Sequence, residues 1–140
     1  MENFEILYPG HELSEIPKHL LKLLPKSKTD VDTAQKVVES NYHDIEFILP
    51  HLIMWLQDMN WPVAQVLAPM FANIGKPLAP IIVPILKSND EIWKYWILIT
   101  VVDVKGLALA NDLRDELQDL LLGDNSEGVP LIAEKILNKL

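Results

Sequence analysis

The chain has 140 residues and a mass of 15.9 kDa, the size of one compact domain. Its 49% hydrophobic content excludes a disordered chain, and the absence of cysteine excludes a disulfide scaffold, a thiolate nucleophile and a zinc–cysteine site. Twelve Lys and Arg against 20 Asp and Glu give a net charge of −8, which argues against nucleic acid or anionic lipid as the main partner.

Apolar residues recur every three or four positions along nearly the whole chain, and the alternation typical of a half-buried strand is absent. The pattern predicts an all-α protein of about eight helices. Capping and turn residues place these helices at about 14–24, 30–40, 43–57, 61–74, 77–87, 91–102, 107–122 and 130–140.

Proline, glycine and capping residues add local detail. Pro17 is expected in the first turn of its helix, and Pro50 predicts a kink or break inside the third helix. Gly75 closes the fourth helix at a position that favours positive φ. Thr29 or Asp30 is expected to cap the second helix, and Ser88 with Glu91 to form a capping box.

The segment Trp61–Leu86 is long and apolar enough to span a bilayer, with Lys76 as its sole charge. Five prolines divide it, which favours two buried helices over a membrane span. The opening segment Met1–Gly10 carries Glu2 and Glu5 where a secretory signal needs Lys or Arg. We therefore expect a cytoplasmic protein without a membrane partner.

One pattern repeats along the chain. Asp58 and Trp61 stand 32 residues before Asp90 and Trp93, and apolar residues on both sides match at the same offset. A period of this length with two helices in each unit is typical of a helical solenoid, in which neighbouring units bury one another's apolar faces.

The strings WLQDMNWPVA at 55–64 and DEIWKYW at 90–96 resemble the paired signatures of a small bacterial family of unknown function, most densely over residues 25–100. The resemblance implies an all-helical fold with HEAT-like repeats and implies no activity. We predict one domain, 1–140, folded as a short HEAT-like helical-repeat solenoid. Its parts are N-terminal helices at 12–42, central repeats at 43–75 and 76–106, and a degenerate repeat at 107–140.

The signature residues have two interpretations. In the structural one, each Asp accepts backbone N–H groups at a helix start and each following Trp packs on the preceding helix. In the functional one, aromatic anchors with a polar rim form a protein-binding edge. The candidate residues are Trp55, Asp58, Trp61, Asp90, Trp93, Lys94 and Trp96. An alternative is a small enzyme or ligand-binding protein whose pocket is lined by Trp55, Asp58 and Trp96.

Catalytic and metal-binding patterns are weak. His11 and His19 are eight residues apart, as are His43 and His51, which places each pair too far apart to share a metal directly. His43 and Glu46 lack a suitable third ligand nearby, and no Gly-x-Ser-x-Gly motif is present. We therefore predict no catalytic residue, no metal and no cofactor.

Charge is unevenly distributed along the chain. The N-terminal segment is locally basic, with Lys18, His19, Lys22, Lys26 and Lys28. Residues 103–127 hold seven acids against Lys105 and Arg114, and such a face would either steer a basic partner or keep a very apolar chain in solution. We predict a non-catalytic protein-binding module, either a bacterial adaptor or a toxin-immunity protein, whose partner is another protein of basic character.

Overall fold

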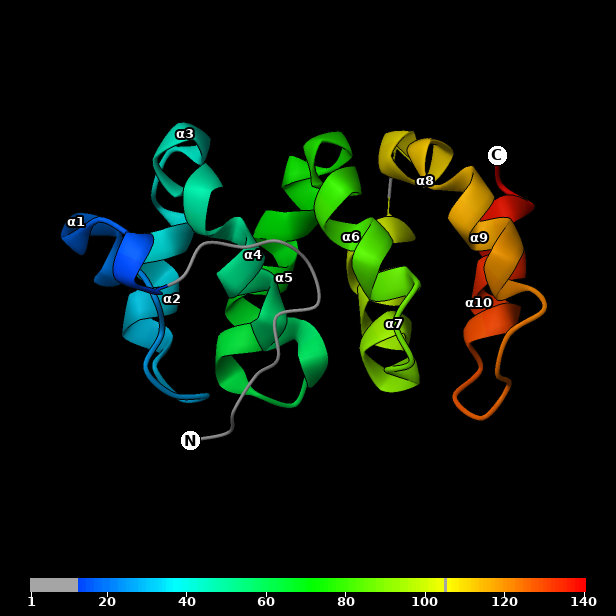
Figure 1. Cartoon of the computed structure of the whole chain (residues 1–140), viewed down its shortest axis with the longest axis horizontal. Coiled ribbons are helices and arrows are strands. Elements are labelled where there is room, and N and C mark those ends of the chain that lie inside the picture. The colour runs from blue at the N-terminus through cyan, green and yellow to red at the C-terminus, as the bar shows by residue number, and fades with distance from the viewer. Residues whose placement is uncertain (1–12, 105) are drawn as a thin grey trace. The chain divides into compact units, whose positions relative to one another are not determined.

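The structure is a computed structural model that describes residues 13–104 and 106–140. Every regular element within these ranges is helical (Figure 1), so the all-α prediction is confirmed. The HEAT-like solenoid remains a prediction. The α-helices are α1 (Lys18–Leu21), α2 (Val31–Val38), α3 (Tyr42–Ile45), α4 (Leu49–Leu52), α5 (Pro62–Ile74), α6 (Ala79–Leu86), α7 (Glu91–Ile97), α8 (Ala108–Asp112), α9 (Arg114–Leu120) and α10 (Val129–Leu137).

The chain divides into two compact units, which we call unit 1 (Met1–Met70) and unit 2 (Phe71–Leu140). The division falls inside α5, before the end of the repeat predicted at 43–75. Each unit has its own apolar core. In unit 1 the core includes Ala34, Val37, Leu49, Leu52, Leu56, Val63 and Leu67, and in unit 2 it includes Leu78, Ile82, Ile85, Trp93, Ile97, Leu117 and Ile136.

The first and third predicted helices are shorter or more broken than their periodicity suggests. The helix expected at 14–24 is reduced to a 3-10 turn at Leu13–Glu15 and to α1, because Pro17 precedes α1 as its N-cap rather than lying in its first turn. The break predicted at Pro50 is confirmed. Pro50 lies in the first turn of α4, where its missing N–H leaves no backbone hydrogen bond unmade, and 3-10 segments flank that helix.

Two later helices also change geometry part-way. The helix predicted at 91–102 is α7 followed by a π-helical segment, Leu98–Val102, in which the Asp103 N–H donates to the Leu98 carbonyl at 2.7 Å. The helix predicted at 107–122 is divided at Leu113 into α8 and α9. Periodicity alone does not separate these geometries, because the apolar face continues through the change.

Of the two helix caps expected from the sequence, the one on α2 is present and the one on α7 differs. Asp30 caps α2 and accepts from the Thr33 N–H at 3.3 Å. It is one of the two caps that the sequence predicted. The capping box of Ser88 with Glu91 is wrong. Ser88 instead donates to the Ile85 carbonyl at 2.7 Å, and the carboxylate that caps α7 belongs to Asp90. Aspartate at the N-cap satisfies a free helix donor directly, so no box is needed.

Gly75 has a φ of +65°, in agreement with the conformational freedom that its position predicts. Its N–H donates to the Phe71 carbonyl at 3.2 Å, which ends α5. No single helix in the described ranges is long and apolar enough to cross a membrane. One bent pair, Pro62–Ile74 with Lys76–Leu86, meets the criteria of length and composition when its two helices are taken together.

Candidate functional site

Four turns that lead into α2, α5, α7 and α10 each contain an aspartate whose carboxylate accepts a nearby backbone N–H. Asp30 accepts from Thr33 at 3.3 Å and Asp90 from Trp93 at 3.0 Å. Asp58 accepts from Asn60 at 2.9 Å, and Asp124 accepts from Ser126 at 2.6 Å. Within each unit these carboxylates therefore fix the turn geometry before a helix, which is the role that the structural interpretation gives to Asp58 and Asp90.

Sequence analysis named Asp30 as one of two possible caps of the second helix and did not identify Asp124. A usable signal was present, because the two residues stand 28 residues before Asp58 and 34 residues after Asp90. Hydrogen bonds lower the pKa of both Asp30 and Asp124. The Lys26 backbone N–H, together with Thr33, lowers the pKa of the Asp30 carboxyl, and hydrogen bonds from Ser126 lower the pKa of Asp124.

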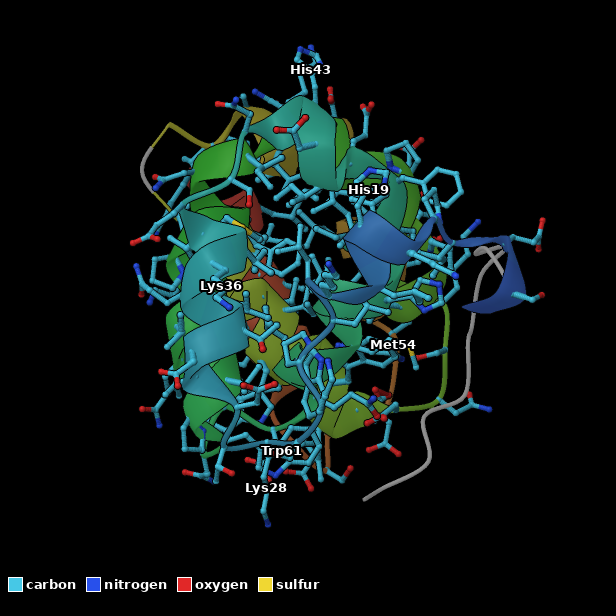
Figure 2. The ribbon with its side chains drawn as sticks, turned by 90° about the vertical axis from the view of Figure 1, so that its left-hand side faces the viewer. His19, Lys28, Lys36, His43, Met54 and Trp61 are labelled. Carbon is cyan, nitrogen blue, oxygen red and sulfur yellow. The ribbon has the colours of Figure 1, made fainter. Side chains whose placement is uncertain are left out.

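The string WLQDMNWPVA at 55–64, in unit 1, forms a turn that two tryptophan rings support. The Trp55 ring is buried and meets the half-buried Trp61 ring edge to face, with the two centroids 5.8 Å apart. Figure 2 shows Trp61 near Lys28 at one end of the unit, and the Val63 N–H donates to the Lys28 carbonyl at 3.0 Å. Trp61 is thus the more accessible tryptophan of this pair.

The second signature, in unit 2, is largely inaccessible. Trp93 is 1% exposed, and its indole N–H has no acceptor among the residues that the structure describes. The Lys94 side chain is also buried and lies 2.9 Å from a Glu91 carboxylate oxygen. Trp96 is half-buried against the edge of Tyr95. Burial favours the structural interpretation for Trp93 and Lys94, because neither presents its side chain to solvent.

The remaining predicted sites have less structural definition. Trp55 and Asp58 lie in unit 1 and Trp96 lies in unit 2, so the pocket predicted between these three residues stays a prediction. Within residues 13–104 and 106–140, no group of three His, Asp or Glu side chains is placed to hold a metal ion. His11 lies outside the described residues, whereas His43 points away from unit 1 at the end opposite Trp61 (Figure 2).

The charged surface predicted at residues 103–127 requires one correction. Asp103 is only 11% exposed at its side chain, and it pairs with Lys139 at 2.6 Å and with Lys135 at 3.7 Å. It joins the end of the π-helical segment to α10 instead of contributing to an open acidic face. Other acids of the segment do face solvent, including Asp112, Asp115, Asp119, Asp124 and Glu127.

Unit 2 also carries an apolar surface that sequence analysis did not identify. A hollow of about 360 Å³ lies on α10, lined by Leu131, Ile132, Glu134, Lys135 and Asn138. Leu131 is 70% exposed, and Leu122, in the turn before α10, is 94% exposed. Helical spacing alone does not distinguish these leucines from core residues.

These features define an all-helical protein in which aspartates fix four of the turns before helices and in which the C-terminal hairpin exposes apolar side chains. Residues 23–129 match the family model described as domain of unknown function (DUF5071), and the chain belongs to that family. The resemblance to a family of unknown function is thereby confirmed, whereas the repeat and signature details stay predictions. A search of curated proteins found no match.

Proposed function

We propose that this protein is a non-catalytic protein-binding module of the bacterial cytoplasm, acting as an adaptor or as an immunity protein that neutralises a toxin. The observation that supports the proposal best is the exposure of Leu122 and Leu131 on the hairpin formed by α9 and α10. Large apolar side chains beside acidic ones are typical of surfaces that bind another protein.

Burial favours the C-terminal hairpin over the tryptophan-bearing edge that the sequence predicted. Of the residues predicted to form that edge, Trp55, Trp93 and Lys94 are buried, and Trp61 and Trp96 are half-buried. A binding anchor has to be reached by its partner, and the centre of an interface is normally an exposed apolar side chain that becomes desolvated. Replacement of Trp61 is therefore the best test of the predicted tryptophan-bearing edge.

The experiment starts from the intact chain used as bait in a lysate of its native organism, followed by purification of the captured complex. Leu131→Asp and Trp61→Ala variants, each first verified as folded by circular dichroism, then locate the surface. We expect a partner that forms a complex of fixed stoichiometry and is lost with Leu131→Asp. If no protein forms such a complex with the wild-type chain, the proposed binding function is wrong.

A toxin-immunity role has a further readout. Where the captured partner halts growth when it is expressed alone, co-expression of the wild-type chain should restore growth and the Leu131→Asp variant should not. Growth arrest that persists with the wild-type chain contradicts immunity and leaves the adaptor role.

A further inference from the structure

The π-helical segment Leu98–Val102 turns Asp103 toward α10. In an α-helix, a residue five positions further on lies about 140° around the axis, because each residue advances by about 100°. The hydrogen bond from the Asp103 N–H to the Leu98 carbonyl closes a wider turn, which brings Asp103 back above Leu98. Leu98 is buried, and α10 packs against this segment. The π geometry therefore places Asp103 on the side of the helix that faces α10.

Two lysines near the C-terminal end of the chain pair with Asp103 at this position. The Lys139 Nζ lies 2.6 Å from the Asp103 Oδ1, and the Lys135 Nζ lies 3.7 Å from the Oδ2. The Asp103 side chain is only 11% exposed, so solvent screens these ion pairs less than it screens pairs on an open surface. With α-helical geometry at 98–102, the carboxylate would point away from both lysines. The π geometry and the ion pairs therefore stabilise each other.

The backbone that follows Asp103 is strained. Leu107, the residue before α8, has a φ of +50°, in the left-handed region that residues other than glycine rarely adopt. Such a conformation persists only where the surrounding contacts enforce it, and it is common in segments that change conformation. The π-helical turn is itself a rare form of helix. Two unfavourable backbone geometries thus lie on either side of the one carboxylate that is tied to α10.

We propose that the π-helical segment and the end of α10 form one two-state device, with Asp103 as the contact between its two parts. In the docked state, the segment is π-helical and Asp103 pairs with Lys139 and Lys135. In the released state, the Asp103 N–H donates to the Ile99 carbonyl, as in an α-helix, and the end of α10 loses its ion pairs. Removal of the Lys139 charge shifts the protein toward the released state, because only the docked state contains the ion pair.

The device lies entirely within unit 2 and needs no partner, so the isolated, intact chain is sufficient for a test. Nuclear magnetic resonance identifies the acceptor directly, because a scalar coupling across a hydrogen bond joins the donor nitrogen to the accepting carbonyl carbon. The docked state has a coupling from the Asp103 nitrogen to the Leu98 carbonyl, and the released state has one to the Ile99 carbonyl. Amide hydrogen exchange at Asp103 is the second readout.

Four variants separate the ion pair from a general loss of charge. Lys139→Gln removes the closest partner of Asp103, and Lys139→Arg keeps its charge. Lys135→Gln removes the more distant partner. The matched control is Lys76→Gln, which breaks the exposed pair of Lys76 with Asp112, 3.9 Å apart in the same unit.

We expect Lys139→Gln to weaken the coupling to Leu98, to give a coupling to Ile99, and to accelerate exchange of the Asp103 amide about fivefold. Lys135→Gln should have a smaller effect, because its ion pair is longer and its side chain is more exposed. Lys139→Arg and Lys76→Gln should both retain the wild-type couplings and exchange rate.

An equally strong coupling to Leu98 in the wild type and in Lys139→Gln would overturn the inference, because the ion pair would then not hold the π geometry. Faster exchange at Asp103 without any coupling to Ile99 would contradict the released state. Equal responses to Lys139→Gln and Lys76→Gln would show that the effect is not specific to Asp103. A wild-type chain whose Asp103 N–H couples to Ile99 alone would lack the docked state.

Discussion

Replacement of Trp93 by phenylalanine tests whether an indole N–H is left without an acceptor inside unit 2. Trp93 is 1% exposed, and no described residue accepts from its ring nitrogen. A buried donor without a partner costs about 1–3 kcal/mol of stability. Phenylalanine keeps an aromatic ring at this position and removes the donor, so the substitution relieves that cost.

The volume lost in the substitution acts in the opposite direction. Tryptophan is larger than phenylalanine by roughly 40 Å³, and at about 24 cal/mol for each Å³ the cavity costs about 1 kcal/mol, to which the lost transfer free energy of the removed atoms adds. The two effects nearly cancel, so Trp93→Phe should unfold within about 1 kcal/mol of the wild type. Trp93→Ala removes the ring itself and should cost about 3–5 kcal/mol.

The assay is urea denaturation followed by far-ultraviolet circular dichroism, since the substitution alters tryptophan fluorescence. The matched control is Trp55→Phe. Trp55 is 5% exposed and packs edge to face on Trp61, so this change should lose about 1–2 kcal/mol. A loss above about 2 kcal/mol for Trp93→Phe, or equal losses for both tryptophans, would show that the Trp93 N–H is paired after all.

Three further experiments test individual contacts. Asp30→Ala should cost about 0.5–2 kcal/mol at pH 7, because it removes the cap of α2. Since hydrogen bonding to the carboxylate lowers the pKa of Asp30, its contribution is present above the unfolded value near 4 and is lost as pH falls through the lower folded pKa. The urea midpoints of variant and wild type should therefore converge in acid, and a constant gap contradicts this reasoning. A double-mutant cycle of Trp55→Phe and Trp61→Ala should give a coupling of about 0.5–1.5 kcal/mol, whereas strictly additive losses would argue against their ring contact. Asp103→Asn should cost about 1 kcal/mol in low salt and less in high salt, and a loss independent of salt would count against the pairing with Lys139.

The sequence predicted most of the helical order because its signals are local. Asp30 as a cap, Gly75 at positive φ and the break at Pro50 each depend on a few neighbouring backbone groups. Such signals act within one turn of helix, so the residue type is enough to identify them. The turn aspartates Asp58 and Asp90 belong to the same class, because their acceptor role is fixed within two or three residues.

The features that sequence analysis missed depend on contacts between distant segments. Asp103 was predicted as part of an acidic face, but it is partly buried and forms an ion pair with Lys139, 36 residues later. The helix at 130–140 was predicted without its buried face, and α10 turns Ala133 and Ile136 toward the core and leaves Leu131 outside. The phase of a helix relative to its neighbours decides which apolar residue is buried, and periodicity does not specify that phase when both faces are apolar.

The turn aspartates and the proposed binding surface have different roles. All four turn aspartates fall inside the family match at 23–129, and each is engaged by a backbone N–H of its own turn. These hydrogen bonds stabilise the turns in which the aspartates lie. Trp93 and Lys94 are likewise directed inward. These turn-forming and buried residues therefore support the fold, and partner choice is better tested at the exposed residues of α10, where Leu131 can be changed with little effect on the core.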